Sequence, residues 1–240
     1  MKIAEKLKAK QDIYNQPPVT VAFLGDSVTQ GCFECYTKSE TAVETVFDYK
    51  SAYSTRVREL LNILYPNVQV NIINSGISGD NAKNGLSRME RDIFAYSPDL
   101  AVVSYGLNDA ACGGVDGAAA YVETVGKIFA ALKEKGIEGI FLTQNFMCTH
   151  TSPHLKEDIF KRLAVSFAKV QNEGVLKAYY EAAKAAVAAQ GGKICDIYAA
   201  WEKMNAYGVD TTELLANKLN HPLRELHYYT AVKIIETMFE

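Results

Sequence analysis

Four short segments of this chain carry residue types that together could perform acyl transfer through a serine. Ser27 could be the nucleophile, His221 could take its proton, and Gly79 and Asn108 could donate N–H groups to an oxyanion. The segments are Gly25-Asp26-Ser27, Ser78-Gly79-Asp80, Gly106-Leu107-Asn108-Asp109 and His221-Pro222. Their chemistry is complementary, so the set predicts a serine hydrolase centre, which no segment would predict alone.

The elements that must position these segments are indicated by the hydrophobic pattern. Apolar, β-branched runs predict five strands buried on both faces, at residues 19–24, 68–73, 100–105, 137–142 and 193–197. Helical patterns alternate with them, at residues 2–13, 52–65, 83–96, 118–135, 155–190 (broken near Glu173-Gly174) and 224–238. The alternation predicts an α/β fold with a doubly wound parallel sheet and helices on both faces.

The chemical segments follow the predicted strands in turn. Ser27, Gly79 and Asn108 come after the first, second and third strands, and His221 precedes the last helix. Ligands of such sheets bind at the carboxyl ends of the strands, so these residues are expected to share one cleft.

Simpler interpretations exist for each segment. Gly25-Asp26-Ser27 could be an ordinary turn, Asp80 or Asn81 a helix cap, and Asn108-Asp109 turn chemistry. A nucleotide site is excluded at residues 25–31, because they match neither the dinucleotide fingerprint nor the phosphate-binding loop.

With these residues in place, the chain resembles an SGNH hydrolase of the GDSL lipase/esterase superfamily, from the first strand through the last helix. The resemblance implies one domain over residues 1–240, with residues 1–18 as a helical extension, and a three-layer α/β/α sandwich around a flavodoxin-like sheet of about five strands. It implies Ser27 as nucleophile and His221 as base. The oxyanion hole would comprise the N–H groups of Ser27 and Gly79 and the Asn108 side chain, with no metal or organic cofactor.

The chain departs from the family pattern at one position. The family usually has Asp three residues before the catalytic histidine, and this chain has Lys218. The imidazole could instead be oriented by Asn217, Asn220, Glu225 or a main-chain carbonyl, giving a Ser-His dyad or an unusual triad. Glu225 could also serve only the dipole of the last helix.

The leading functional hypothesis is hydrolysis of a small or short-acyl carboxylic ester, with an O-acetylated sugar among the candidates. Residues 31–50 are expected to form a long loop, either a plain solvated loop or a substrate-binding flap, and its polar and aromatic side chains suit a hydroxyl-rich substrate. The alternatives are a lysophospholipase or acyl-thioesterase, and a non-catalytic binding module on the same scaffold, motivated by the missing Asp.

Composition and short motifs restrict the partners, location and metal sites that are expected. The formal net charge of −3 disfavours nucleic acid as a partner. No secretory signal or membrane-spanning run is recognised, and the five cysteines are an odd set, so the expected location is cytoplasmic and the expected ligand is a small ester. Cys32 and Cys35 match a C-x-x-C motif. A redox dithiol would open a helix, whereas this pair lies in the expected loop, so a redox role is disfavoured. His150 and His154 match H-x-x-x-H, but Pro153 breaks the helix that would align them, so no metal site is expected.

Overall fold

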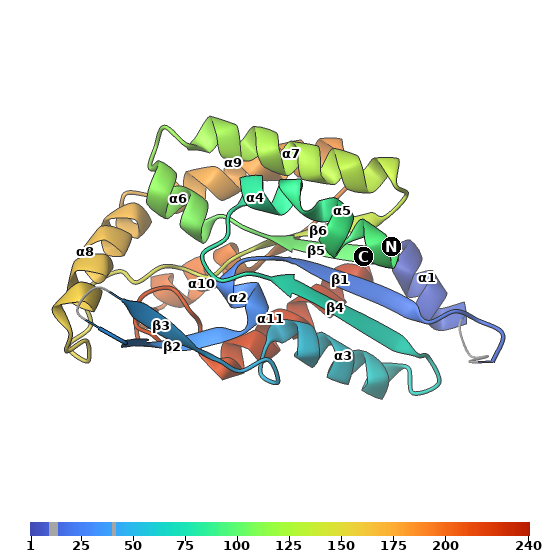
Figure 1. The fold of residues 1–240 in the computed structure, drawn as a ribbon, viewed down its shortest axis with the longest axis horizontal. Coiled ribbons are helices and arrows are strands. Elements are labelled where there is room, and N and C mark those ends of the chain that lie inside the picture. The colour runs from blue at the N-terminus through green and yellow to red at the C-terminus, as the bar shows by residue number, and fades with distance from the viewer. Residues whose placement is uncertain (10–13, 40–41) are drawn as a thin grey trace.

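Five parallel strands form the central sheet of the computed structural model, which describes residues 1–9, 14–39 and 42–240 (Figure 1). The sheet has the order β4-β1-β5-β6-β7. The strands are β1 (Val19–Gly25), β4 (Val70–Gly76), β5 (Leu100–Ser104), β6 (Glu138–Thr143) and β7 (Lys193–Asp196). When the five strands of this sheet are numbered along the chain, the order is 2-1-3-4-5, which is the order in flavodoxin. The predicted sheet is therefore confirmed.

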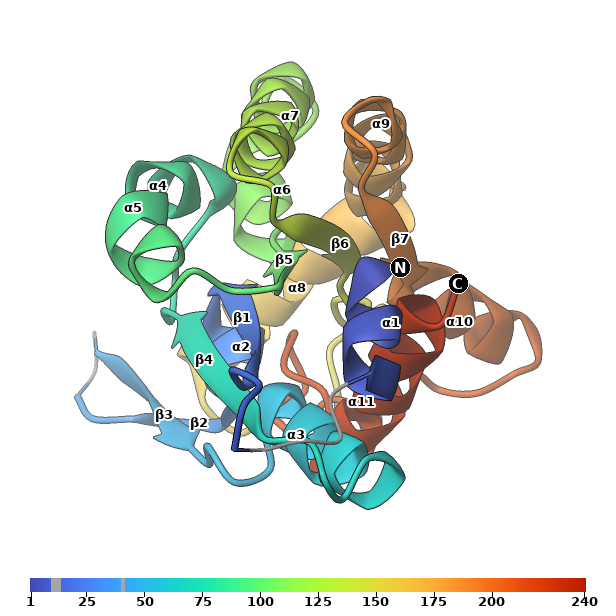
Figure 2. The same cartoon turned by 90° about the vertical axis from the view of Figure 1, so that its right-hand side faces the viewer.

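Helices cover both faces of the sheet, as Figure 2 shows. One face carries α1 (Lys2–Ala9), α3 (Tyr53–Leu64) and α11 (Arg224–Met238). The other carries α4 (Ala82–Ser87), α5 (Met89–Asp92), α6 (Leu107–Gly113), α7 (Ala118–Glu134) and α9 (Val175–Ala189). This is the predicted three-layer sandwich. Because both faces are covered, β1 and β5 consist almost wholly of buried residues.

Two predicted helices differ from the structure in continuity. The helix expected at residues 83–96 is divided into α4, α5 and the 3₁₀ turn η1 (Phe94–Tyr96). The division falls at Arg88, whose backbone leaves the helical conformation. The expected break near Glu173-Gly174 is found between α8 (Asp158–Asn172) and α9, where Gly174 has a φ of +74°. The expected first helix is described as far as Ala9, and its residues 10–13 lie outside the described part.

The prediction of a loop at residues 31–50 is wrong in one respect, because much of this segment forms an antiparallel ribbon. The ribbon pairs β2 (Cys32–Thr37) with β3 (Val43–Phe47), and residues 40–41 lie outside the described part. Its Val, Thr, Tyr and Phe residues favour strands. The C-x-x-C motif therefore lies on a strand. Arg224 of α11 holds the ribbon through Glu34 and, just beyond β3, Asp48, and these ion pairs lower the pKa of both carboxyls.

Three further helices in the described part of the chain were not expected: α2 (Ser27–Gln30) directly after β1, α6 after β5, and α10 (Ile197–Ala206) after β7. Within the ranges that the structure describes, helices long and apolar enough to cross a membrane are absent.

Candidate active site

Ser27 is the first residue of α2, directly beyond the carboxyl end of β1. Asp26 caps this helix, because its carboxylate accepts a hydrogen bond from the Val28 N–H at 3.0 Å. The first N–H groups of a helix have no acceptor within the helix, so the Ser27 N–H is available to an anion. The Ser27 side chain therefore emerges beside a backbone N–H group that can still donate.

His221 contacts both the serine and the ribbon. Its Nε2 lies 3.0 Å from the Ser27 Oγ, and its Nδ1 lies 2.9 Å from the carbonyl oxygen of Phe33 on β2. A carbonyl can only accept, so Nδ1 carries the proton and donates it to Phe33. In the neutral ring, Nε2 then has the lone pair that accepts the serine hydrogen. This is the geometry needed for proton transfer from Ser27.

Burial keeps the imidazole neutral. His221 is buried, and desolvation lowers its pKa to about 4, although the Phe33 carbonyl acts in the opposite direction. An unprotonated base is therefore present at neutral pH, although no carboxylate of the described residues is hydrogen-bonded to the ring and Glu34 acts on it only through its charge.

The side chains expected to orient His221 lie elsewhere. Asn217 holds the loop rather than the ring, because its Oδ1 accepts from the backbone N–H groups of Leu219, Asn220 and His221 at 3.0, 2.9 and 2.9 Å. The Asn220 Oδ1 accepts from Asn217 Nδ2 at 3.0 Å. Glu225 is exposed in the first turn of α11. Of the alternatives predicted, the structure has the main-chain carbonyl at Nδ1.

Lys218, at the position of the usual Asp, turns toward a different partner. Its backbone has a φ of +57°, and its ammonium group lies 2.9 Å from the carboxylate of Glu213 and 2.8 Å from the Glu213 carbonyl oxygen. It therefore adds no charge beside the imidazole of His221.

The two remaining oxyanion candidates lie together after β4 and β5. Gly79 has a φ of +78°, which an L side chain rarely adopts, and a Cβ placed there would meet no atom within 4 Å. Asn108 donates from Nδ2 to the carbonyl oxygen of Asp80 at 2.8 Å. Among the described residues, no hydrogen-bond acceptor is found for the Gly79 N–H. The amide of Asn108 is thus attached to the turn that carries a free N–H group.

A buried arginine that the sequence did not indicate supports this turn. Arg88 donates from Nε to Asp80 at 2.9 Å and from one terminal nitrogen to the Gly25 carbonyl at 3.0 Å and the Tyr105 hydroxyl at 2.7 Å. Its other terminal nitrogen donates to Asp92 at 2.7 Å. One side chain therefore connects the end of β1 with the turn after β4.

Asp26 and Gln144 form a second buried contact that the sequence did not indicate. Gln144 follows β6, and its Nε2 donates to both Asp26 carboxylate oxygens at 2.9 Å. Burial raises the Asp26 pKa to about 7, against the opposing effect of the Gln144 hydrogen bond. The signal that indicated Asn108, a polar residue at a strand's carboxyl end, was equally present for Gln144.

Two glycines allow α2 to lie against the strand ends. Gly25 of β1 and Gly76 of β4 are paired in the parallel register. A Cβ at Gly25 would lie 2.0 Å from the Thr29 hydroxyl oxygen, and one at Gly76 would lie 2.2 Å from the Gln30 nitrogen. No side chain fits at either place, so both positions require glycine for steric reasons.

The other three histidines do not contact Ser27. His227 is buried on α11, where its Nδ1 accepts from the Tyr53 N–H at 3.1 Å and its ring lies 4.7 Å from the Phe33 ring. It thus supports the residue whose carbonyl meets His221. His150 and His154 lie near Asp210 and Glu213, respectively.

Comparison with known proteins relates the chain to acyl hydrolases. The profile of the GDSL-like lipase/acylhydrolase family matches residues 23–227. An acetylxylan esterase of Geobacillus stearothermophilus is 31% identical over 87 residues, which is 36% of this chain and 38% of that protein, so the matched stretch spans well under half of the relative.

Solved structures of similar proteins share the fold. A catalytic mutant of an acetylxylan esterase from Geobacillus stearothermophilus has a TM-score of 0.67 and 18% identity, covering 92% of this chain and 94% of that one. A two-domain esterase active on acetylated mannans has a TM-score of 0.62 and 18% identity, covering 99% of this chain and 51% of that one.

Proposed function

The chain belongs to the GDSL-like lipase/acylhydrolase family, and from that premise we propose that it is a carboxylic ester hydrolase with Ser27 as nucleophile and His221 as base. The observation that carries the proposal is the 3.0 Å contact between the Ser27 Oγ and the His221 Nε2. It joins a hydroxyl at a helix N-terminus to an imidazole whose other nitrogen is already engaged.

The reaction would proceed through an acyl-enzyme. His221 takes the Ser27 proton while the oxygen attacks the ester carbonyl, and it then returns the proton to the leaving alcohol. Water activated by the same imidazole releases the acid. The imidazolium formed at each step is stabilised by the Phe33 carbonyl dipole, which is weaker than a carboxylate. The centre thus operates as a Ser-His dyad with a backbone acceptor.

The oxyanion would be held by the N–H groups of Ser27 and Gly79 and by Asn108. An amide side chain has two N–H bonds, and the one given to the Asp80 carbonyl fixes the orientation of the other. A donor of this kind typically lowers the barrier by about 3 kcal/mol. Arg88 would contribute indirectly, since it holds the Asp80 carboxylate in the same turn.

The substrate we propose is an O-acetylated sugar. The ribbon that supplies the Phe33 carbonyl also exposes Tyr36, Phe47 and, just beyond it, Tyr49, which are 51%, 43% and 57% exposed. The rings of Phe47 and Tyr49 are stacked with centroids 6.0 Å apart. Exposed aromatic faces beside polar groups can receive the apolar face of a sugar ring. The acetylated xylan and mannan substrates named for the relatives favour the same class.

The proposal is tested by p-nitrophenyl acetate hydrolysis with the wild type, Ser27→Ala and the control Ser87→Ala, which changes an exposed serine of α4. Ser27→Ala should reduce kcat on the order of 10³-fold or more. The control should retain the wild-type rate. Equal rates for wild type and Ser27→Ala would overturn the hydrolase proposal, and acetylated xylo-oligosaccharide binding without turnover would then favour a binding module.

Substrate class is tested by comparing acetylated xylo-oligosaccharides with p-nitrophenyl butyrate and octanoate and with an acyl thioester. The proposal expects the highest kcat/KM on the acetylated sugar. A higher kcat/KM on the octanoate ester would favour the lysophospholipase alternative, and one on the thioester would favour the acyl-thioesterase.

A further inference from the structure

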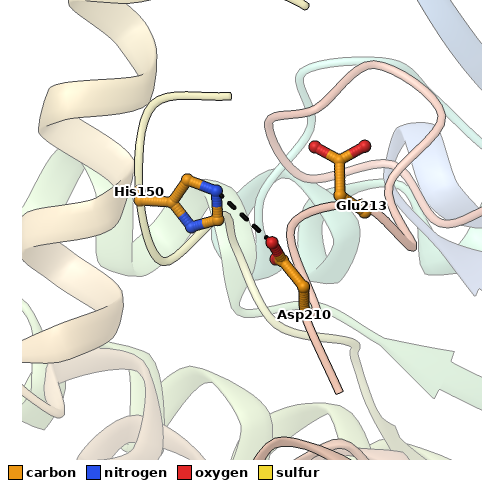
Figure 3. Close-up of side chains that lie close together, drawn as sticks. All are labelled: His150, Asp210 and Glu213. Carbon is orange, nitrogen blue, oxygen red and sulfur yellow. Dashed lines mark ion pairs between the residues drawn. The ribbon is translucent and has the colours of Figure 1, made fainter. Parts of the chain in front are cut away.

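Two loops that are far apart in the sequence are joined at the surface beyond β6 (Figure 3). The segment after β6 carries His150 and His154, and the turn after α10 carries Asp210 and Glu213. The Thr149 N–H donates to the Thr212 hydroxyl at 2.9 Å, and the Ser152 hydroxyl donates to Glu213 at 2.8 Å. These hydrogen bonds bring the His150 imidazole near two carboxylates, and the His154 imidazole lies near Glu213.

The potential ligand atoms lie close together. The His150 Nε2 is 3.6 Å from the Asp210 carboxylate, and suitable atoms of His150, Asp210 and Glu213 all lie within 4.8 Å of one another. The His154 Nε2 is 3.9 Å from the Glu213 carboxylate. Two ligands of one tetrahedral zinc ion are about 3.3 Å apart, given bonds of about 2.0 to 2.1 Å. Side-chain rotations of His150, Asp210 and Glu213 would therefore bring their ligand atoms to that spacing, and a rotation of His154 would add a fourth ligand beside Glu213.

The orientation of His150 also suits a cation. Its Nδ1 lies 3.3 Å from the hydroxyls of both Thr149 and Thr212, which can accept the Nδ1 proton. In the tautomer that places the proton on Nδ1, the Nε2 lone pair faces the Asp210 carboxylate at 3.6 Å, where both could ligate one cation. A metal-ligating histidine is commonly oriented through its second nitrogen in this way.

The turn that contains Asp210 also orients its carboxylate. One carboxylate oxygen accepts from the Thr212 N–H at 3.0 Å, while the other is the oxygen that faces His150. The carboxylate is thus held by the backbone with one oxygen directed across the gap between the loops.

From these contacts we propose that His150, Asp210 and Glu213 bind a divalent zinc ion, with His154 as the fourth ligand. Two imidazole nitrogens and two carboxylate oxygens are a zinc-type donor set, whereas calcium and magnesium favour oxygen alone. The side chains are 45%, 49%, 36% and 71% exposed in the order named, so they have room to rotate onto the ion.

Lys218 opposes the ion. Its ammonium group occupies one Glu213 oxygen at 2.9 Å and must be displaced or tolerated when the ion binds. The residue that replaces the expected Asp of the triad would therefore also limit the affinity of the zinc site. Removing its charge should strengthen binding.

The proposed zinc site lies between the two loops, and its ligands are far from Ser27 in the sequence. The Cys148 N–H donates to the Leu219 carbonyl at 2.7 Å, and the Ala216 N–H donates to the His221 carbonyl at 2.7 Å. A zinc ion between the two loops would add a cross-link beside these bonds. Its effect is thus expected in thermal stability, which can be measured separately from ester hydrolysis.

The test measures Zn²⁺ binding by titration calorimetry and by the zinc-dependent rise in Tm. All proteins carry Cys112→Ser, because Cys112 is an exposed thiol that could bind zinc elsewhere. The parent should bind one equivalent. His150→Ala and Asp210→Asn should each weaken binding about tenfold or more and abolish the rise in Tm. Asp158→Asn, which changes an exposed carboxylate of α8, should behave as the parent, and Lys218→Met should bind more tightly.

Circular dichroism without zinc checks that each variant is folded. Absence of saturable binding by the parent would overturn the proposal, as would equal affinity in the parent and the folded His150→Ala protein. A Co²⁺-loaded parent provides a second measurement, because tetrahedral ligation by these residues should give a visible absorption spectrum that His150→Ala lacks.

Discussion

The Nδ1 of His221 donates to the backbone carbonyl of Phe33 at 2.9 Å, so a peptide group stands where a triad would have a carboxylate. This places the orientation of the base under the control of the β2–β3 ribbon. A peptide carbonyl cannot be removed by changing a side chain and does not titrate. The proton affinity of His221 is therefore governed mainly by burial.

The first prediction concerns the pH dependence of ester hydrolysis. The base must be neutral to accept the Ser27 proton, so activity is present above its pKa and lost as the pH falls through it. Burial lowers that pKa to about 4. The value of kcat/KM should therefore show no histidine-dependent decrease at pH 5.5 and should decline as the pH approaches about 4.

The measurement is the pH profile of kcat/KM on p-nitrophenyl acetate, with circular dichroism at each pH to separate loss of fold from loss of activity. An Asp26→Asn protein measured in parallel removes a buried carboxyl whose pKa is raised to about 7, and an Asp109→Asn protein removes one whose pKa is raised to about 6. A histidine limb centred near 6.5 in the folded variants would contradict the prediction.

The second prediction concerns the arginine behind the oxyanion turn. Arg88→Met would leave the buried Asp80 carboxylate without its cation and would remove one of two donors to the Gly25 carbonyl, which also accepts from the Ile77 N–H. Breaking a buried ion pair in this way costs about 3 to 5 kcal/mol. Urea unfolding should show this loss, and kcat should fall in the folded fraction because the turn carrying Gly79 is less constrained.

Arg91 provides the matched control. It also pairs with Asp92, but its side chain is 72% exposed, so Arg91→Met should change the free energy of unfolding by less than about 1 kcal/mol. Similar losses in the two variants would mean that the buried network around Arg88 contributes little.

The third prediction concerns the buried carboxyl next to the nucleophile. Burial raises the Asp26 pKa from 3.8 to about 7, so the folded state binds a proton more readily than the unfolded state. Its contribution to stability is therefore greatest below pH 3.8 and decreases as the pH rises toward 7. Asp26→Asn removes this ionisation. The free energy of unfolding of the variant, relative to that of wild type, should therefore increase by about 1.4 kcal/mol per pH unit between pH 3.8 and about 7.

Urea unfolding of wild type and Asp26→Asn at pH 5 and pH 8 measures the difference. Asp158→Asn, at an exposed carboxylate, should show the same pH dependence as wild type. A difference between wild type and Asp26→Asn that is constant with pH would show that the carboxyl is ionised throughout.

Much of the arrangement could be predicted because it depends on strand ends. A buried apolar run fixes each strand, and the carboxyl ends of parallel strands meet at one edge, so the approach of His221 to Ser27 follows from their places in the sequence. The bounds of α11 were predicted at both ends, since its pattern begins just after Pro222 and continues to Met238.

What the sequence did not indicate depends on groups without a local pattern. The Phe33 carbonyl is a backbone atom, and only the formation of the ribbon brings it to His221. Arg88 lies in a helical run that gives no sign of its burial. Asp210 and Glu213 are about sixty residues from His150, so the spacing of the H-x-x-x-H motif does not reveal that they lie near its histidines.

The glycine pair at the ends of β1 and β4 has a consequence for protein engineering. Transferring this nucleophile to another parallel sheet would require two adjacent strand ends without side chains before any reactive group is introduced, because α2 occupies the volume that a methyl group would need. In a library of random variants, Gly25 and Gly76 should therefore be as intolerant of substitution as Ser27, although their role is purely steric.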